Sequence, residues 1–454
     1  MIIVLYLITA ATCIGTLFRP WIGVVAYYFL SIIGPQYIWP WIVGDFRISK
    51  IIVLATLVST VIHLAAGRLS IASLKQPYVY CIVAIYCLLR LSDFLSPFQG
   101  EIIPSNMVPP DFIFRYLDTL LLMHLLAIMT IQTTRHLWYF AFALGVSTFY
   151  LTYWANMQYL SGLMYELNYD GRLRGPGGIY IDTNSFGLLF VIAAPFFIYV
   201  GSTFKNAFIR YGFWLCVPLI WHAAFLTGSR GALLSLGIST LFIAWQYRSK
   251  TFSAVLVLLF MGAVATQAGQ VLDRTTDTVN TEERFEDKPL DPRILSWIVG
   301  LNIMKDYPLL GVGTGRFQQA YPRYQEGYNY VAHNTFLQFT ANAGLPVGIL
   351  MISIGIMLWR KLKRRPSPDR EILEEAAFEN DEHELHRFYS LRKACVASLV
   401  AFLVGSLFLD LMIWEPLYYL LAFLVCSFSI EDKLSEERPL GGKIESQTMQ
   451  THLS

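Results

Sequence analysis

Long apolar runs recur along the whole 454-residue chain and are separated by short polar segments. A run of about 20 residues, rising about 1.5 Å per residue, can cross a hydrocarbon layer about 30 Å thick as an α-helix. We therefore predict an all-α, polytopic integral membrane protein with about 12–13 transmembrane helices. The chain enters its first apolar run directly, so we expect a retained membrane segment there. The predicted spans are 2–17, 21–38, 48–65, 78–95, 116–131, 137–154, 185–200, 212–227, 231–246, 252–268, 336–358, 394–409 and 413–430.

Basic residues assign the connections between these spans to two sides of the membrane. The sequence RKLKRR at 360–365 marks the connection 359–393 as cytoplasmic. Counting the spans backward places further basic residues on the same side, namely Arg68, Lys75, Arg135, Lys205, Arg210, Arg248 and Lys250. The connections at about 96–115, 155–184 and 269–335 then lie outside, which is the periplasm for a bacterial inner membrane.

The longest connections divide the chain into four parts. We expect 1–268 to form the first part of a transmembrane bundle and 269–335 to form a periplasmic catalytic loop with short amphipathic helices. The last part of the bundle follows at 336–430, and 431–454 is predicted to be a cytoplasmic tail.

Composition supports a membrane environment and excludes other partners. The chain is 55% hydrophobic and 15% charged, with a mean hydropathy of +0.49, so its surface needs membrane lipids as solvent. A net charge of +2, dispersed between apolar runs, gives no basic patch for nucleic acid, and we expect no nucleic acid partner. The six cysteines lie in apolar segments, and no cluster of histidines or carboxylates has metal-ligand spacing. We therefore predict no metal site.

The connection 269–335 is the least membrane-like stretch, and a loop of this length is usually functional. Within it, apolar residues at helical spacing across 293–305 predict a helix lying on the membrane surface, with Asp291 as its cap. The glycine-rich sequence 310–317 allows tight turns but lacks the Gly-Lys-Ser/Thr of a nucleotide-binding loop. Four tyrosines between 321 and 330 are suited either to interfacial anchoring or to packing on sugar faces.

His333 and Arg230 are the sharpest candidates for chemistry. The imidazole of His333 can accept a proton near neutral pH at the external mouth of the bundle, although His333 and Asn334 can also serve only to cap the next helix. Arg230 lies between two apolar runs, where a charge must face the bundle interior or a water-filled cavity. Its guanidinium could hold an anionic phosphate group by forked hydrogen bonds.

The external connection 155–184 also carries residues suited to an anion. Arg172 and Arg174 stand beside glycines there, while Asp182 and Asn184 precede an apolar run that they can cap. Asp410 and Glu415 fall at the external turn between the last two spans and can simply mark that turn. In contrast, His63, His124 and His222 are isolated in apolar runs and are expected to be hydrogen-bonded interior residues.

Taken together, these motifs resemble the O-antigen ligase and polymerase superfamily of polytopic glycan-transfer enzymes. The resemblance covers about 18–430 and rests on the order of its motifs along one membrane face. The N-terminal RPWIGVVAYY at 19–28 is similar to the O-glycosylation ligases associated with exosortase systems. The motifs are Arg172 with Gly175, Asp182 with Asn184, Ser229-Arg230-Gly231, Arg293 with Trp297, Pro308 to Gly313, His333-Asn334, and Gly344 to Gly348.

The resemblance implies transfer of a glycan from a polyprenyl-pyrophosphate carrier to a lipid, protein or saccharide acceptor at the periplasmic face, with no cofactor, nucleotide sugar or metal ion. It implies that Arg230 and Arg172, together with Arg174 or Arg293, bind the pyrophosphate. His333 would take the acceptor hydroxyl proton or orient the hydroxyl, and Asn334 would belong to the substrate site.

Two other functions remain open from the sequence. A polymerase of polysaccharide repeat units would use the same residues with a different acceptor. A transporter of polyprenyl-linked or anionic solutes would use the external arginines as an anion gate, although the chain has no obvious internal repeat of the kind such transporters contain.

Overall fold

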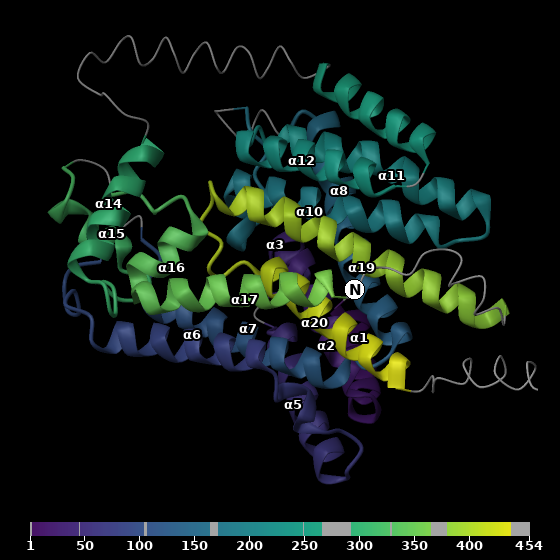
Figure 1. The fold of residues 1–454 in the computed structure, drawn as a ribbon, viewed down its shortest axis with the longest axis horizontal. Helices are drawn as coiled ribbons and strands as arrows, with labels where there is room; N and C mark the ends of the chain where they lie inside the picture. Colours follow the sequence, from purple (N-terminus) through teal and green to yellow (C-terminus); the bar gives the residue numbers. More distant parts are fainter. Residues whose placement is uncertain are drawn as a thin grey trace, which may run out of the picture.

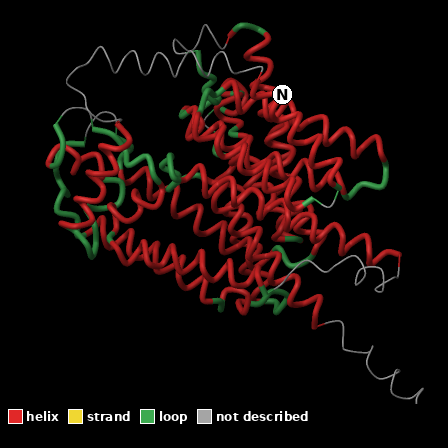
Figure 2. Tube along the Cα trace, turned by 45° about the horizontal axis from the view of Figure 1, so that its top comes forward, coloured by secondary structure: helices red, strands yellow, loops and turns green. Residues whose placement is uncertain are grey.

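A computed structural model describes residues 2–44, 46–103, 107–163, 171–247, 249–265, 292–326, 329–364 and 379–436. Within these ranges every regular element is a helix, as the tube drawing in Figure 2 shows. The N-terminal half contains α1 (Ile2–Phe18), α2 (Pro20–Ile33), α3 (Pro35–Ile38), α4 (Pro40–Val43), α5 (Ile48–Ala65), η1 (Ile71–Leu74), α6 (Pro77–Phe94), α7 (Pro110–Thr130), α8 (Thr134–Leu160), η2 (Gly178–Ile181), α10 (Thr183–Ser202) and α11 (Ala207–Leu226). The C-terminal half contains α12 (Arg230–Gln246), α14 (Pro292–Asp306), α15 (Phe317–Ala320), η3 (Tyr321–Arg323), α16 (Thr335–Ala343), α17 (Leu345–Lys363), α19 (Glu379–Ser406) and α20 (Glu415–Glu436).

The apolar helices confirm the predicted class of all-α polytopic membrane protein. Eight helical segments of the described chain are long and apolar enough to cross a membrane, and two shorter apolar helices cover Ile3–Phe18 and Lys250–Ala265. Many large apolar side chains on these helices are exposed, including Leu54 at 62% and Ile349 at 63%. Such exposure suits a surface that faces lipid rather than water.

Helix α10 forms the centre of the bundle, surrounded by α8, α11, α12 and α19 (Figure 1). Of its most apolar 18-residue stretch, 94% is buried inside the protein. Small residues permit close packing around it: a Cβ on Gly187 would lie 2.6 Å from Thr227 Oγ1, and a Cβ on Gly405 of α19 would lie 2.7 Å from Leu188. The Ser398 hydroxyl of α19 also donates a hydrogen bond to the Ile192 carbonyl. Helix α10 therefore fixes the positions of α12 and α19.

A small second core lies at one end of the bundle, where α14, α15 and α16 gather at the left of Figure 1. Val299 and Ile303 of α14 pack there with Phe317, Tyr321 and Leu337. The predicted helix at 293–305 is therefore confirmed as α14, although Asp291, its expected cap, lies outside the described residues. We refer to this end of the bundle as the α16 end.

The predicted span 336–358 is wrong as a single helix. The chain breaks at Gly344, whose φ of 89° favours glycine, and α16 and α17 lie on either side of the break. A Cβ at this position would lie 2.1 Å from the Leu309 carbonyl oxygen. Helix α16 belongs to the second core through Leu337, and only α17 continues as a membrane-length helix.

The glycine-rich segment 310–316 is a packing element that joins the second core to α6. The amides of Val312 and Gly313 donate hydrogen bonds to carbonyl oxygens at the end of α16, and the Thr314 hydroxyl donates to the Leu89 carbonyl of α6. Arg316 Nε lies 2.9 Å from Asp93 Oδ1, with these two side chains only 10% and 21% exposed. These contacts account for the glycines of this segment without a ligand.

We predict that Asp93→Ala destabilises the protein by about 2–3 kcal/mol, because it leaves the Arg316 guanidinium in a mostly buried position without its ionic acceptor. Asp118→Ala is the control, since the Arg90–Asp118 pair is 43% and 47% exposed and should contribute less than about 1 kcal/mol. Thermal unfolding of both variants in one detergent provides the comparison. Equal losses would contradict the structural role assigned to the Asp93–Arg316 pair.

Candidate functional site

The N-terminus of α10 carries a polar cluster at the α16 end. The Asp182 carboxylate accepts hydrogen bonds from the Ser185 amide at 2.9 Å and the Ser185 hydroxyl at 2.8 Å. It also accepts one from the Asn184 side-chain amide at 3.0 Å. Asp182 is therefore the helix cap that the sequence predicted, and it orients the Asn184 side chain.

Arg172 connects this cap to the turn between α11 and α12. Its guanidinium donates from Nη2 to Asn184 Oδ1 at 3.2 Å and from Nε to the Thr227 carbonyl oxygen at 3.1 Å. The neighbouring Leu173 amide donates to the Leu226 carbonyl at 2.9 Å. The loop before α10 is thus held against the turn that leads to Arg230.

Arg230 is the first residue of α12, directly after the buried cap Ser229. In the sequence this charge lies between apolar runs, where burying it would cost free energy. In the structure the side chain is exposed at the start of the helix, so the charge is not buried. No other described residue forms a hydrogen bond or ion pair with its guanidinium. Arg230 is consequently available to an external anion, whereas Arg172 is held by the protein.

The segment 407–409, between α19 and α20, links Arg230 to the His333 region. A Cβ on Gly231 would lie 3.4 Å from Phe408 Cβ, so the start of α12 packs against this segment. The Leu407 carbonyl accepts a hydrogen bond from Asn334 Nδ2 at 3.3 Å, and the Leu409 carbonyl accepts one from the Thr335 hydroxyl at 2.7 Å. Residues more than 100 positions apart in the sequence therefore meet around one short segment.

The structure shows which of His333 and Asn334 caps the next helix. Asn334 is the cap of α16, since its Oδ1 accepts a hydrogen bond from the Leu337 amide at 3.0 Å. His333 is half-buried, and its ring lies 6.5 Å from that of Tyr330. Its φ of 48° is the only positive value for a non-glycine residue in the described chain. A strained backbone of this kind is typical of functional positions.

Asp410 is the residue at this site that the sequence undervalued. Burial is the main cause that raises the pKa of its carboxyl group, to about 6; a hydrogen bond from the Met412 amide opposes the shift, and the nearby Asp182 carboxylate adds to it. The sequence suggested only that Asp410 marks a turn, because nothing in its neighbours indicates the proximity of Asp182. A titratable carboxyl group with a raised pKa is an observation typical of functional sites.

Two further predicted arginines lie on the loop before α10 and on α14. Arg174 is exposed on the loop that carries Arg172, and Arg293 is half-buried in the first turn of α14. Among the four tyrosines, Tyr321 is 1% exposed and belongs to the second core, so interfacial anchoring was the wrong interpretation for it. Tyr328 lies outside the described residues.

The interior histidines behave as predicted. His124 is fully buried between the Tyr78 hydroxyl at 2.6 Å and the Tyr418 carbonyl at 3.0 Å. His63 contacts backbone carbonyls, and His222 contacts Asn156 Oδ1. In the described part of the chain, no group of three or more His, Cys, Asp or Glu side chains is placed to hold a metal ion.

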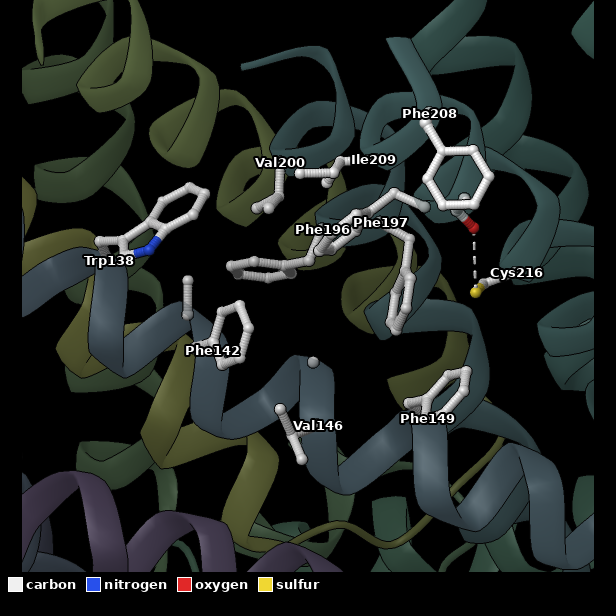
Figure 3. Close-up of a pocket in the computed structure, with 14 residues that line it drawn as sticks. Trp138, Phe142, Val146, Phe149, Phe196, Phe197, Val200, Phe208, Ile209 and Cys216 are labelled. Atoms are coloured by element: carbon white, nitrogen blue, oxygen red, sulfur yellow. Dashed lines mark hydrogen bonds between the residues drawn. The ribbon is translucent and has the colours of Figure 1, made fainter. Parts of the chain in front are cut away.

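One cavity of about 350 Å³ lies between α8, α10 and α11 and is lined by apolar side chains such as Trp138, Phe142 and Phe197 (Figure 3). The polar interaction drawn there joins the Cys216 thiol to the Gly212 carbonyl within α11. This cavity has no charged lining residue and suits lipid chains. It is therefore a poor candidate for a site that binds an anion.

Residues 212–352 match the family model described as O-antigen ligase. This segment is therefore similar to an O-antigen ligase domain. The matched O-antigen ligase domain covers about a third of the chain and contains Arg230, Arg293, His333 and Asn334. A comparison with curated proteins finds no match. Arg172 and Asp410 lie outside the matched domain, and Arg172 donates a hydrogen bond to Thr227 within it. Asp410 follows the segment 407–409, whose carbonyl groups accept hydrogen bonds from Asn334 and Thr335 of the domain.

We predict that His333→Gly leaves the stability of the O-antigen ligase domain within about 1 kcal/mol of the natural protein, because glycine adopts the positive φ without steric cost. His333→Val should lower stability by about 1–2 kcal/mol, because a β-branched side chain opposes that conformation. Thermal unfolding in detergent measures both effects. A valine variant as stable as the glycine variant would argue against backbone strain at this position.

Asp410 should produce a pH-dependent stability. Its folded-state pKa of about 6 exceeds the ordinary value of 3.8, so folding favours the protonated form and stability falls as pH rises from about 4 to 6. At pH 7 we expect Asp410→Asn to be more stable than the natural protein, by at most about 3 kcal/mol, with the gain absent below pH 4. Asp111→Asn on the exposed start of α7 is the control. A gain for Asp410→Asn that does not change with pH would refute the assignment.

Proposed function

We propose that the protein transfers a glycan from a polyprenyl-pyrophosphate carrier to an acceptor hydroxyl at the periplasmic face of a bacterial inner membrane. The observation that carries this proposal is that the segment 407–409 contacts both Gly231, next to Arg230, and Asn334, next to His333. Arg172 is hydrogen-bonded to Thr227 in the turn that leads to Arg230. The match of residues 212–352 to the O-antigen ligase family supports glycan transfer as the reaction class. The donor, the membrane face and the residue roles are our inference.

The arginines are suited to the leaving group. Breaking the bond between the anomeric carbon and the phosphate oxygen places negative charge on the pyrophosphate, and a guanidinium group stabilises that charge by forked hydrogen bonds. Arg230 is exposed and has no ionic partner among the described residues, so it would make the main contact. Arg172, oriented by Asn184 and Thr227, would hold the second phosphate, with Arg174 and Arg293 as further contacts. These cations offer the stabilisation that a divalent metal supplies in other transferases.

His333 is suited to the acceptor. As the acceptor oxygen attacks the anomeric carbon, its proton passes to the imidazole, while the carrier pyrophosphate leaves with the electrons of the broken bond. An in-line attack inverts the anomeric centre. Asn334 holds the neighbouring backbone through α16 and the Leu407 carbonyl, which keeps His333 in its strained position.

The distribution of basic residues supports a periplasmic orientation. Arg360, Lys361 and Lys363 lie in the last turn of α17, at the end of that helix away from α16. Near them, Arg392 of α19 pairs with Glu431 of α20, and Lys361 lies 3.9 Å from Asp432. By the positive-inside rule, this basic end is cytoplasmic and the α16 end is periplasmic.

We predict that Arg230→Gln and His333→Gly each reduce glycan transfer by about 10²–10³-fold, because each removes an interaction that strengthens in the transition state. The assay uses purified protein in nanodiscs with a polyprenyl-pyrophosphate-linked glycan and measures transfer at matched protein amounts. Lys305→Gln, an exposed cation at the end of α14, is the control and should retain full transfer.

Undiminished transfer in both variants would overturn the proposal. The product also identifies the acceptor class: transfer to a different molecule indicates a ligase, and a growing carrier-linked ladder indicates a repeat-unit polymerase. Movement of the glycan across the membrane without bond formation would instead favour a transporter.

A further inference from the structure

A second cavity, which unlike the first has a partly polar wall, lies among the N-terminal helices, outside the O-antigen ligase domain. It has a volume of about 840 Å³, within the range of about 300–1,000 Å³ typical of small-molecule sites. Its walls come from α2, α3, α5 and α7, from the loop at 177–180 and from the start of α20. The residues assigned above to transfer do not line it.

Three cations surround this cavity. Arg47 and Lys50 stand at the start of α5, and Arg115 stands in the second turn of α7. All three side chains are exposed, and none of them forms an ion pair with a described carboxylate. Among the described residues, the Arg115 guanidinium donates a hydrogen bond to the Asp111 carbonyl alone, at 3.2 Å. Membrane proteins concentrate such residues on the cytoplasmic side, so the positive-inside rule does not explain three cations here if this end is periplasmic, as we propose.

A buried carboxyl group faces the same cavity. Glu415, the first residue of α20, is 6% exposed, and its Oε2 atom has no hydrogen-bond partner in the described structure. Ser31 of α2 lies beside this carboxyl group. A buried acceptor oxygen without a donor costs free energy, and a ligand hydroxyl group would satisfy it.

The wall of the cavity becomes apolar along α5. Val53, Leu54 and Leu57 follow Lys50 on the lining face, and at about 1.5 Å per residue they extend the wall about 10 Å toward the membrane interior. Leu54 is 62% exposed, so the cavity opens laterally toward lipid at this level. Cations above an apolar wall match the structure of an amphiphile, in which a charged headgroup is joined to hydrocarbon.

We propose that this cavity binds a membrane amphiphile whose headgroup carries a phosphate and at least one hydroxyl group. The phosphate lies among Arg47, Lys50 and Arg115, where guanidinium and ammonium groups provide charge-assisted hydrogen bonds. The hydroxyl donates to Glu415, and the hydrocarbon chain follows the apolar wall of α5. Only the interpretation of the three cations as unusual rests on the proposed orientation; the chemistry of the cavity does not depend on it.

The cavity shares one wall with the proposed transfer site. A Cβ on Gly177 would lie 2.5 Å from the Tyr37 ring, so the loop that begins with Arg172 packs directly on α3. The amide of Gly175 in the same loop donates to the Tyr180 carbonyl at 2.7 Å. The loop 171–182 therefore contributes Arg172 to the proposed transfer site and residues 177–180 to the cavity, and an occupied cavity would support the loop that holds Arg172.

The test uses dioctanoyl phosphatidylglycerol, which has a phosphate, free hydroxyls and short chains, titrated calorimetrically into the full-length protein in a neutral detergent. We expect saturable binding that the variant Arg47→Gln/Lys50→Gln/Arg115→Gln weakens at least tenfold. Glu415→Gln should weaken it several-fold but should leave binding of dioctanoyl phosphatidic acid, which lacks the hydroxyl groups, unchanged. The matched control Arg68→Gln/Lys205→Gln/Lys250→Gln changes three cations that lie outside the cavity and should bind normally.

Further titrations distinguish a lipid phosphate from free phosphate, and they distinguish failure of this proposal from failure of the proposed function. Dioctanoylglycerol, without phosphate, and inorganic phosphate, without chains, should each bind at least tenfold more weakly than the phospholipid. Equal binding by either, or an equal loss in the control triple variant, overturns the proposal. Arg230→Gln and His333→Gly should bind the phospholipid normally even where transfer is lost. If transfer survives in both of those variants, the proposed function fails while the binding result still decides the cavity.

Discussion

The burial of α10 is the constraint on which the site depends. This helix is enclosed by α8, α11, α12 and α19. Gly187 and Gly405 allow α12 and α19 to pack in direct contact with it, so the positions of these two helices are fixed. Its N-terminal cap is the Asp182–Asn184 cluster, which holds Arg172. The interior packing of an apolar helix thereby sets the positions of charged groups at its end.

Because α19 packs on α10, it also fixes part of the O-antigen ligase domain. Where that helix ends, the carbonyl groups of Leu407 and Leu409 accept hydrogen bonds from Asn334 and Thr335, so α16 and His333 are attached to the bundle rather than to a free loop. The second core around Phe317 and Tyr321 supports α16 from the other side. In our proposal, a rigid bundle end holds the arginines for the donor and the histidine for the acceptor in a fixed relation.

Sequence periodicity was sufficient for the class of fold, for α14 and for the cap at Asp182, because each depends on local spacing and apolar patterning. It was insufficient for the break at Gly344, since the Leu309 carbonyl that excludes a side chain there is distant in sequence. It also missed the role of the segment 407–409, whose backbone carbonyls carry no residue signal. The raised pKa of Asp410 comes mainly from burial and in smaller part from Asp182, and only the folded chain produces either effect.

The central claim is that Arg230 and Arg172 together bind a carrier pyrophosphate beside His333. Its most direct test is an experimental structure of the protein in nanodiscs with bound polyprenyl pyrophosphate. The account predicts phosphate density within hydrogen-bond distance of the Arg230 and Arg172 guanidinium groups, on the side that faces the His333 imidazole. Pyrophosphate bound away from Arg230, or ordered only in the cavity of Arg47 and Arg115, would contradict it.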